Sequence, residues 1–315
     1  MGFFASLINS MPSAVAQGLI WGIMAIGVYL TYRILDVADL TVDGSLGTGG
    51  AVCVVMVLNG VPVGLALLAA TAAGMLAGLV TGLFHTACGI PAILAGILTQ
   101  LALYSVNLRI MGFGTGGGKA NLPISVDKYS LLVSARYVRS VALNNPILIL
   151  AIFCAVLIAV LYWFFGTELG CSLRATGANQ NMARAQGINT NVTKVLGLMI
   201  SNGLVALAGG LLAQYQGFSD INMGRGAIVI GLAAVIIGEV IFSRIFRNFA
   251  LKLLSAVIGA IIYYIVMVFV LRLGLSTDDL KLLTALVVAL FLTIPYWKGK
   301  YFTKTSVKKG EKNHA

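Results

Sequence analysis

The chain alternates long apolar segments with short polar connections, and each apolar segment is about as long as a membrane-spanning helix. No charged side chain occurs in the first 32 residues or between Ser45 and Leu108. This pattern predicts about nine transmembrane helices, with eight or ten left open. The predicted segments cover residues 12–34, 44–60, 62–84, 90–108, 146–166, 194–216, 226–243, 249–272 and 280–297.

The composition excludes most other classes of protein. Of the 315 residues, 59% are hydrophobic and 10% are charged, and the mean hydropathy is +0.97. Soluble domains are about 45–50% apolar and about 25% charged, so a soluble enzyme, a disordered chain and a fibrous protein are all excluded. We expect an all-α polytopic membrane protein, with residues 1–297 as one transmembrane domain and residues 298–315 as a basic tail.

The net charge of +11 comes from cations placed between the apolar segments and in the tail. In a soluble protein this balance would indicate nucleic acid, but here it is typical of topology signals beside an anionic leaflet, so no nucleic-acid partner is expected. No basic residue precedes the first segment, and Arg33 ends it, which favours an outside N-terminus and a cytoplasmic C-terminus. The external loop 109–145 then carries five basic residues, against the usual bias.

The first polar interruption lies near residues 36–50, where Asp36, Asp39 and Asp43 separate two apolar segments. A charged side chain at the bilayer centre costs about 2.5–3.5 kcal/mol on insertion scales. Irregular backbone persists there only inside protein or beside a water-filled cavity. The interruption predicts a broken or re-entrant segment that lines the substrate pathway, although Asp36 fits a plain cytoplasmic turn equally well. The predicted pathway residues in this segment are Asp39, Thr41, Asp43 and Ser45.

The second interruption, residues 167–194, is the most polar stretch between two strong spans. Ala175, Ala178, Met182 and Ala185 recur at helical spacing and predict a short helix with one smooth face, ending near Gly187. Such a face suits docking into a groove of a soluble partner. An ordinary solvated loop is the alternative that the spacing leaves open.

Several motifs resemble one family of transport proteins. Residues 170–175 (GCSLRA), followed by Asn179, Ala183 and Gly187-Ile-Asn189, resemble the cytoplasmic loop of bacterial ATP-binding-cassette (ABC) importer permeases of the branched-chain amino acid and ribose permease family. Residues 38–45 (ADLTVDGS) resemble the early motif of that family. Residues 231–238 (GLAAVIIG) and 280–284 (LKLLT) resemble its later motifs, in the same order.

The resemblance implies a permease subunit that moves a small polar solute by alternating access. Its implied partners are ATPase subunits in the cytoplasm, a solute-binding protein or lipoprotein outside, and a second permease copy in the bacterial cytoplasmic membrane. Asn222 is a further candidate, at the outer mouth of the pathway. The residues implied to couple to the ATPase are Arg174, Ala175, Gly177, Ala178, Asn179, Met182, Ala183, Gly187 and Asn189. For Arg174, contact with lipid headgroups alone is the alternative left open.

Two acidic residues depart from the family pattern. Asp43 and Glu239 stand where other members carry different residues. Asp43 suggests a subgroup linked to aromatic amino acid uptake, and we expect Glu239 to pair with Arg244 or Arg247. The motifs do not identify the solute itself.

No catalytic or cofactor site is predicted in this chain. The glycine-rich stretch 112–120 lacks the first glycine and the Ser/Thr of a phosphate-binding loop, so it is predicted to be an external turn. The four cysteines lack CxxC spacing and the two histidines lie far apart, so neither disulfides nor a metal site is expected. The alternatives are an ion-coupled secondary transporter using Asp39, Asp43 or Glu239, an intramembrane enzyme and a channel.

Overall fold

The computed structural model describes residues 3–113, 117–125, 128–129, 131–138, 145–242, 246, 248–272 and 280–297. Nine helices of 16 residues or more occur in these ranges and coincide with the nine predicted segments. This confirms the all-α polytopic fold. The long helices are α1 (Phe3–Tyr29), α2 (Val42–Leu58), α3 (Val63–Thr86), α4 (Ala92–Met111), α5 (Pro146–Phe165), α8 (Thr190–Gln216), α9 (Ala227–Phe242), α10 (Phe249–Arg272) and α11 (Leu280–Trp297).

Within the described part of the chain, six segments are long and apolar enough to cross a membrane, namely those of α1, α3, α4, α5, α8 and α10. Helix α2 has 17 residues and α9 has 16, which correspond to about 25 Å of helix. The hydrocarbon core is about 30 Å thick. The irregular residues 35–41, of which Leu35, Val37, Asp39 and Thr41 are buried, precede α2 and supply part of the missing length.

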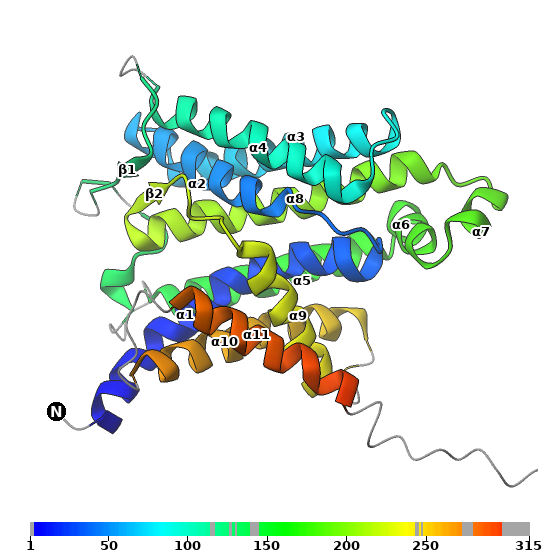
Figure 1. The fold of residues 1–315 in the computed structure, drawn as a ribbon. Helices are drawn as coiled ribbons and strands as arrows, with labels where there is room; N and C mark the ends of the chain where they lie inside the picture. Colours follow the sequence, from blue (N-terminus) through cyan, green and yellow to red (C-terminus); the bar gives the residue numbers. More distant parts are fainter. Residues whose placement is uncertain are drawn as a thin grey trace, which may run out of the picture.

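Two helices form the centre of the molecule (Figure 1). Within their apolar windows, 89% of α1 and 78% of α8 is buried, against 17% of α5 and 28% of α4. Helix α8 packs on α2 and α3, while α1 packs on α9, α10 and α5, and the two central helices also contact each other. The α1–α8 contact therefore joins the two halves of the bundle.

Small residues let α2 and α8 approach closely. A Cβ at Gly49 would overlap the backbone carbonyl of Ala206, and a Cβ at Gly209 would overlap that of Leu46. Close backbone approach of this kind stabilises helix pairs in lipid, where there is no hydrophobic drive between helices. The glycines of the 44–50 segment therefore pack helices together.

The two ends of the bundle carry different structures (Figure 1). At one end, β1 (Asn121–Pro123) pairs antiparallel with β2 (Phe218–Asp220), and Asn121 lies opposite Asp220. The short helices α6 (Glu168–Ala178) and α7 (Gln180–Ala185) lie at the other end. The N-terminus lies at the strand end. We call these the strand end and the α6 end.

Candidate functional site: the broken segment and the α6 end

The predicted break occurs, and it is shorter than predicted. Helix α1 ends in a π-helical turn, Leu30–Ile34, and α2 begins at Val42, so residues 44–50 are regular helix. Asp36 has a left-handed backbone (φ 54°), a conformation that Asp tolerates better than most residues. The Asp36 side chain is exposed, whereas Val37 and Asp39 are buried. Protein thus encloses the irregular segment at alternate residues only, because Ala38 is exposed as well.

Asp39 lies at the centre of a buried hydrogen-bond network. Its Oδ1 accepts from the Thr41 backbone N–H at 2.9 Å, and its Oδ2 accepts from Asn202 Nδ2 at 2.6 Å. Asn202 Oδ1 in turn accepts from the Ser45 hydroxyl at 2.6 Å, and the Thr41 and Thr81 hydroxyls are bonded at 2.7 Å. All five side chains are at most 2% exposed. The network therefore joins the break to α2, α3 and α8.

In this conformation Asp39, Thr41 and Ser45 face protein rather than an open channel, so their pathway role stays a prediction. Sequence reasoning missed Asn202 and Thr81, although each is a polar residue inside an apolar segment. Buried polar groups need hydrogen-bond partners, so a polar residue inside an apolar segment could have indicated a buried network. The sequence could not show that Asn202 bonds Asp39 and Thr81 bonds Thr41, because that depends on how α3 and α8 pack.

Asp43 has a different role from Asp39. Its two carboxylate oxygens accept from the backbone N–H groups of Gly226 and Ile228, each at 2.9 Å. These groups belong to the first turn of α9, where unpaired donors and the helix dipole favour an anion. Asp43 thus caps α9 from α2. Asn222 is exposed at the strand end, where its backbone N–H donates to Asp220 Oδ1 at 2.7 Å.

Glu239 pairs with Arg33, with Arg33 Nε and Glu239 Oε1 2.9 Å apart. The expected partners, Arg244 and Arg247, lie outside the described residues. The observed pair joins the end of α1 to α9. The two residues are far apart in the sequence, so local spacing could not predict it.

The predicted coupling helix is wrong in one respect, because it is two helices rather than one. Helix α6 ends at Ala178 and α7 begins at Gln180, and between them Asn179 is extended (φ −160°, ψ 104°). The Asn179 side chain accepts from the Met182 backbone N–H at 3.1 Å and so caps α7. Gly187 follows α7 with φ +80°, a left-handed conformation that suits glycine. Asn189 then caps α8.

The predicted smooth face is partly exposed. Ala178 and Ala185 are exposed and Met182 is 64% exposed, while Ala175 is half-buried. Ala183, predicted to contact a partner, is only 3% exposed. Of the predicted smooth face, Ala178, Met182 and Ala185 are therefore available to a partner. The other predicted coupling residues that are exposed are Arg174, Asn179, Gly187 and Asn189.

Helix α6 is attached to the ends of three long helices. A Cβ at Gly177 would overlap the Ile34 carbonyl, so α6 lies directly on the end of α1. The Thr176 and Thr193 hydroxyls are hydrogen-bonded at 2.9 Å, which connects α6 to α8. The Arg174 guanidinium lies 5.5 Å from the centre of the Phe249 ring at the start of α10. A displacement of α6 would therefore act on α1, α8 and α10 together.

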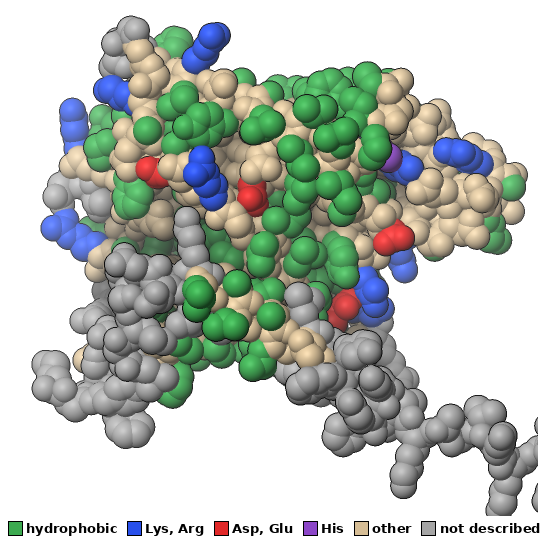
Figure 2. All heavy atoms as spheres, in the orientation of Figure 1, with side chains coloured by type: hydrophobic (Ala, Val, Ile, Leu, Met, Phe, Trp, Pro, Cys, Tyr) green, Lys and Arg blue, Asp and Glu red, His purple; other side chains and the backbone are tan. Residues whose placement is uncertain are grey.

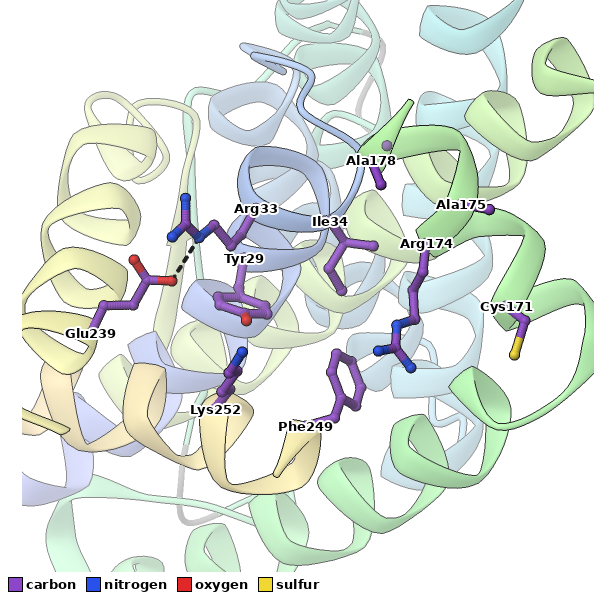
Figure 3. Close-up of a pocket in the computed structure, with 11 residues that line it drawn as sticks. Tyr29, Arg33, Ile34, Cys171, Arg174, Ala175, Ala178, Glu239, Phe249 and Lys252 are labelled. Carbon is purple, nitrogen blue, oxygen red and sulfur yellow. Dashed lines mark ion pairs between the residues drawn. The ribbon is translucent and has the colours of Figure 1, made fainter. Parts of the chain in front are cut away.

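A cavity of about 640 Å³ opens beside α6 (Figure 3). The cations among its lining residues are Arg33, Arg174 and Lys252, and the one carboxylate is Glu239. Among the described residues, no group of three or more His, Cys, Asp or Glu side chains could hold a metal ion. Figure 2 shows hydrophobic side chains over the middle of one face and Lys and Arg side chains towards its ends, the distribution expected across a bilayer.

The family described as "Branched-chain amino acid transport system / permease component" matches residues 10–294. The chain belongs to this family of permeases. The tyrosine transport system permease protein of Clostridioides difficile (strain R20291) is 41% identical to the permease over 284 residues, covering 90% of each chain. The ribose import permease protein RbsC of Escherichia coli (strain K12) is 28% identical over 231 residues, covering 73% of this chain and 69% of its own.

A solved structure, "PsaBC from Streptococcus pneumoniae in complex with Fab", covers 94% of this chain and 99% of its own. The TM-score is 0.52 and the identity is 16%, so the likeness concerns the fold alone. Family membership makes the permease a solute-import subunit of an ABC importer and not an enzyme. It implies ATPase and solute-binding partners and a multi-pass location in the bacterial inner membrane.

Proposed function

We propose that the permease imports an amino acid by alternating access, driven by ATPase subunits that dock on the exposed face of α6 and α7. The attachment of α6 to α1, α8 and α10 carries this proposal, because a force on one short helix reaches three membrane segments. The exposed Met182 supplies the contact surface. The 41% identical tyrosine permease supports an amino acid, with aromatic ones as the first class to test.

In the proposed cycle, ATP binding closes the ATPase subunits and moves α6. The displacement tilts α1 and α8, which are the most buried helices and meet at the centre of the bundle. The predicted pathway around Asp39, Thr41, Asp43 and Ser45 then opens to the other face, with Asn222 at the outer mouth. A second copy of the chain completes the pathway as a homodimer.

The coupling surface can be tested with Met182→Asp. A buried, unpaired charge in a docking groove is costly, so we expect loss of ATPase co-purification and of uptake with normal expression. Phe113→Asp is the matched control for ATPase co-purification, because Phe113 is 78% exposed at the opposite, strand end. Normal co-purification and uptake in Met182→Asp would overturn the docking assignment.

In the proposed orientation, the α6 end is cytoplasmic and the strand end faces the solute-binding protein. Cys88 and Cys171 are exposed, whereas Cys53 and Cys154 are buried, and Lys119 is exposed at the strand end. A membrane-impermeant maleimide should therefore label Lys119→Cys in intact cells and leave the unaltered protein unlabelled. Labelling of Cys171 in intact cells would mean that the α6 end faces outside and that the proposed orientation is wrong.

The solute and the energy source can be tested separately. Vesicles containing the permease, its ATPase and its binding protein should accumulate labelled tyrosine or another amino acid only with ATP inside. The permease alone should accumulate none, even with a proton or sodium gradient. Gradient-driven accumulation would favour the secondary-transporter alternative, which the hydrogen-bonded states of Asp39 and Asp43 do not favour.

A further inference from the structure

We propose that the cavity beside α6 binds the phosphate headgroup of an anionic phospholipid whose acyl chains lie along the outer face of α5. This inference concerns binding of a membrane lipid and goes beyond the proposed transport cycle. It rests on the charges of the cavity, on a second cavity that continues it, and on the exposed surface of α5.

The first cavity carries uncompensated positive charge. Glu239 is paired with Arg33, and in the described part of the chain no carboxylate lies within ion-pair distance of Arg174 or Lys252. Figure 3 shows Arg174 and Lys252 on either side of Phe249 along the cavity. Two cations around a space of about 640 Å³ suit a phosphate, which accepts several charge-assisted hydrogen bonds.

The second cavity joins this charged space to an apolar one. It has about 460 Å³ and shares Arg174 and Phe249 with the first cavity. Its other walls include Tyr162 and Trp163, which are 54% and 71% exposed. Tyr and Trp are enriched at the depth of lipid headgroups, where one side of the ring is apolar and the other polar.

The outer face of α5 continues the apolar surface away from the cations. This helix has the highest hydropathy of the six membrane-length segments and the smallest buried share, 17%. Exposed apolar side chains recur there every four residues, on one face of the helix. They are Leu148, Ile152, Val156 and Val160.

The order of chemistry along this surface matches a phospholipid. Apolar side chains come first, the aromatic pair Tyr162 and Trp163 follows, and Arg174 and Lys252 come last. A free phosphate would need only the cations. Ala178 of the proposed ATPase surface lines the first cavity, whereas the exposed Met182 on α7 lies outside both cavities. A carboxylate of the ATPase would not need a surface continuous with α5. The exposed apolar face of α5 therefore favours a lipid.

The test is native mass spectrometry of the full-length purified protein in mixed phosphatidylglycerol and phosphatidylcholine. We expect phosphatidylglycerol to be retained about 30-fold over phosphatidylcholine, the preference that two cations at a leaflet surface provide. The double variant Arg174→Gln/Lys252→Gln should lose this preference. The control Arg109→Gln/Lys119→Gln removes the same charge from exposed positions near the strand end and should keep it.

Four results would overturn the proposal. Equal retention of the two lipids, or equal loss in both double variants, would exclude a specific site. Displacement of the lipid by inorganic phosphate would assign the cavity to a free anion, and displacement by the ATPase subunits would assign it to a protein partner. If the double variant does not fold, brominated phosphatidylglycerol should still quench the wild-type tryptophan fluorescence more than brominated phosphatidylcholine, and Trp163→Phe should remove the difference.

Discussion

The bundle has two polar interruptions, residues 35–41 and the α6–α7 region. Both pair their polar groups by hydrogen bonds, but they differ in how much of their surface stays exposed. In the first, Asp39, Asn202 and Ser45 satisfy one another and are nearly inaccessible. In the second, the side chains of Asn179 and Thr176 make the hydrogen bonds that hold the segment, while the apolar Ala178 and Met182 remain exposed. A polar segment is thus a structural junction when its polar side chains are paired and buried. It offers a contact surface when the paired side chains hold the segment and apolar ones stay exposed.

We expect the largest loss of uptake and stability from a substitution where the two regions meet, at the contact of Gly177 with Ile34. Overpacking a tight contact costs up to about 3 kcal/mol, and here it would also lift α6 from α1. Gly177→Ala should therefore abolish uptake and lower the thermal midpoint in detergent. Gly64→Ala is the matched control, because no atom lies within 4 Å of a Cβ at Gly64. Equal behaviour of the two variants would contradict the contact.

We expect a somewhat smaller loss of stability when Asp39 is replaced. Asp39→Asn keeps the shape but cannot accept from both Thr41 N–H and Asn202 Nδ2, so a buried donor loses its partner, at a cost of about 2 kcal/mol. Thermal unfolding of the purified variant measures the loss. Asp36→Asn alters an exposed carboxylate of the same segment and should leave the midpoint unchanged. A large loss in Asp36→Asn as well would place the sensitivity in the turn rather than in the network.

Asp43 differs from Asp39 because only backbone N–H groups, and no side chains, donate the hydrogen bonds described for its carboxylate. Asp43→Ala removes the cap of α9 and should cost about 1 kcal/mol, within the range for N-cap residues. Hydrogen exchange should increase at the amides of Gly226 and Ile228. Asp43→Asn retains an acceptor, so it should protect at least one of these amides. Unchanged exchange in Asp43→Ala would mean that the cap is not formed in the membrane.

The smallest effect belongs to the Arg33–Glu239 pair, whose side chains are 59% and 29% exposed. Solvent-exposed ion pairs contribute below about 1 kcal/mol and are screened by salt. A double-mutant cycle of Arg33→Gln and Glu239→Gln should give a small coupling energy of unfolding that falls as salt rises. A coupling that does not depend on salt would indicate a pair more buried than the structure describes.

Much of the fold could be predicted from the chain alone, including nine segments, both interruptions and the family. The site could be predicted only in outline. The face of Ala178 and Met182 followed from helical spacing, but the break at Asn179 and the burial of Ala183 did not, because they depend on how α6 and α7 turn against α8. Asp43 and Glu239 stood out as unusual residues, yet their partners on α9 and α1 lie far away in the sequence.

The order of apolar and polar residues by itself determined where the helices lie and where the bundle is interrupted, because membrane insertion responds to hydropathy within about 20 consecutive residues. Only the tertiary structure decided what each interruption does. Asp39 meets Asn202 across 163 positions, and Asp43 meets Gly226 across 183. Pairing over such distances is fixed by the close glycine-mediated crossing of helices, which no local pattern encodes.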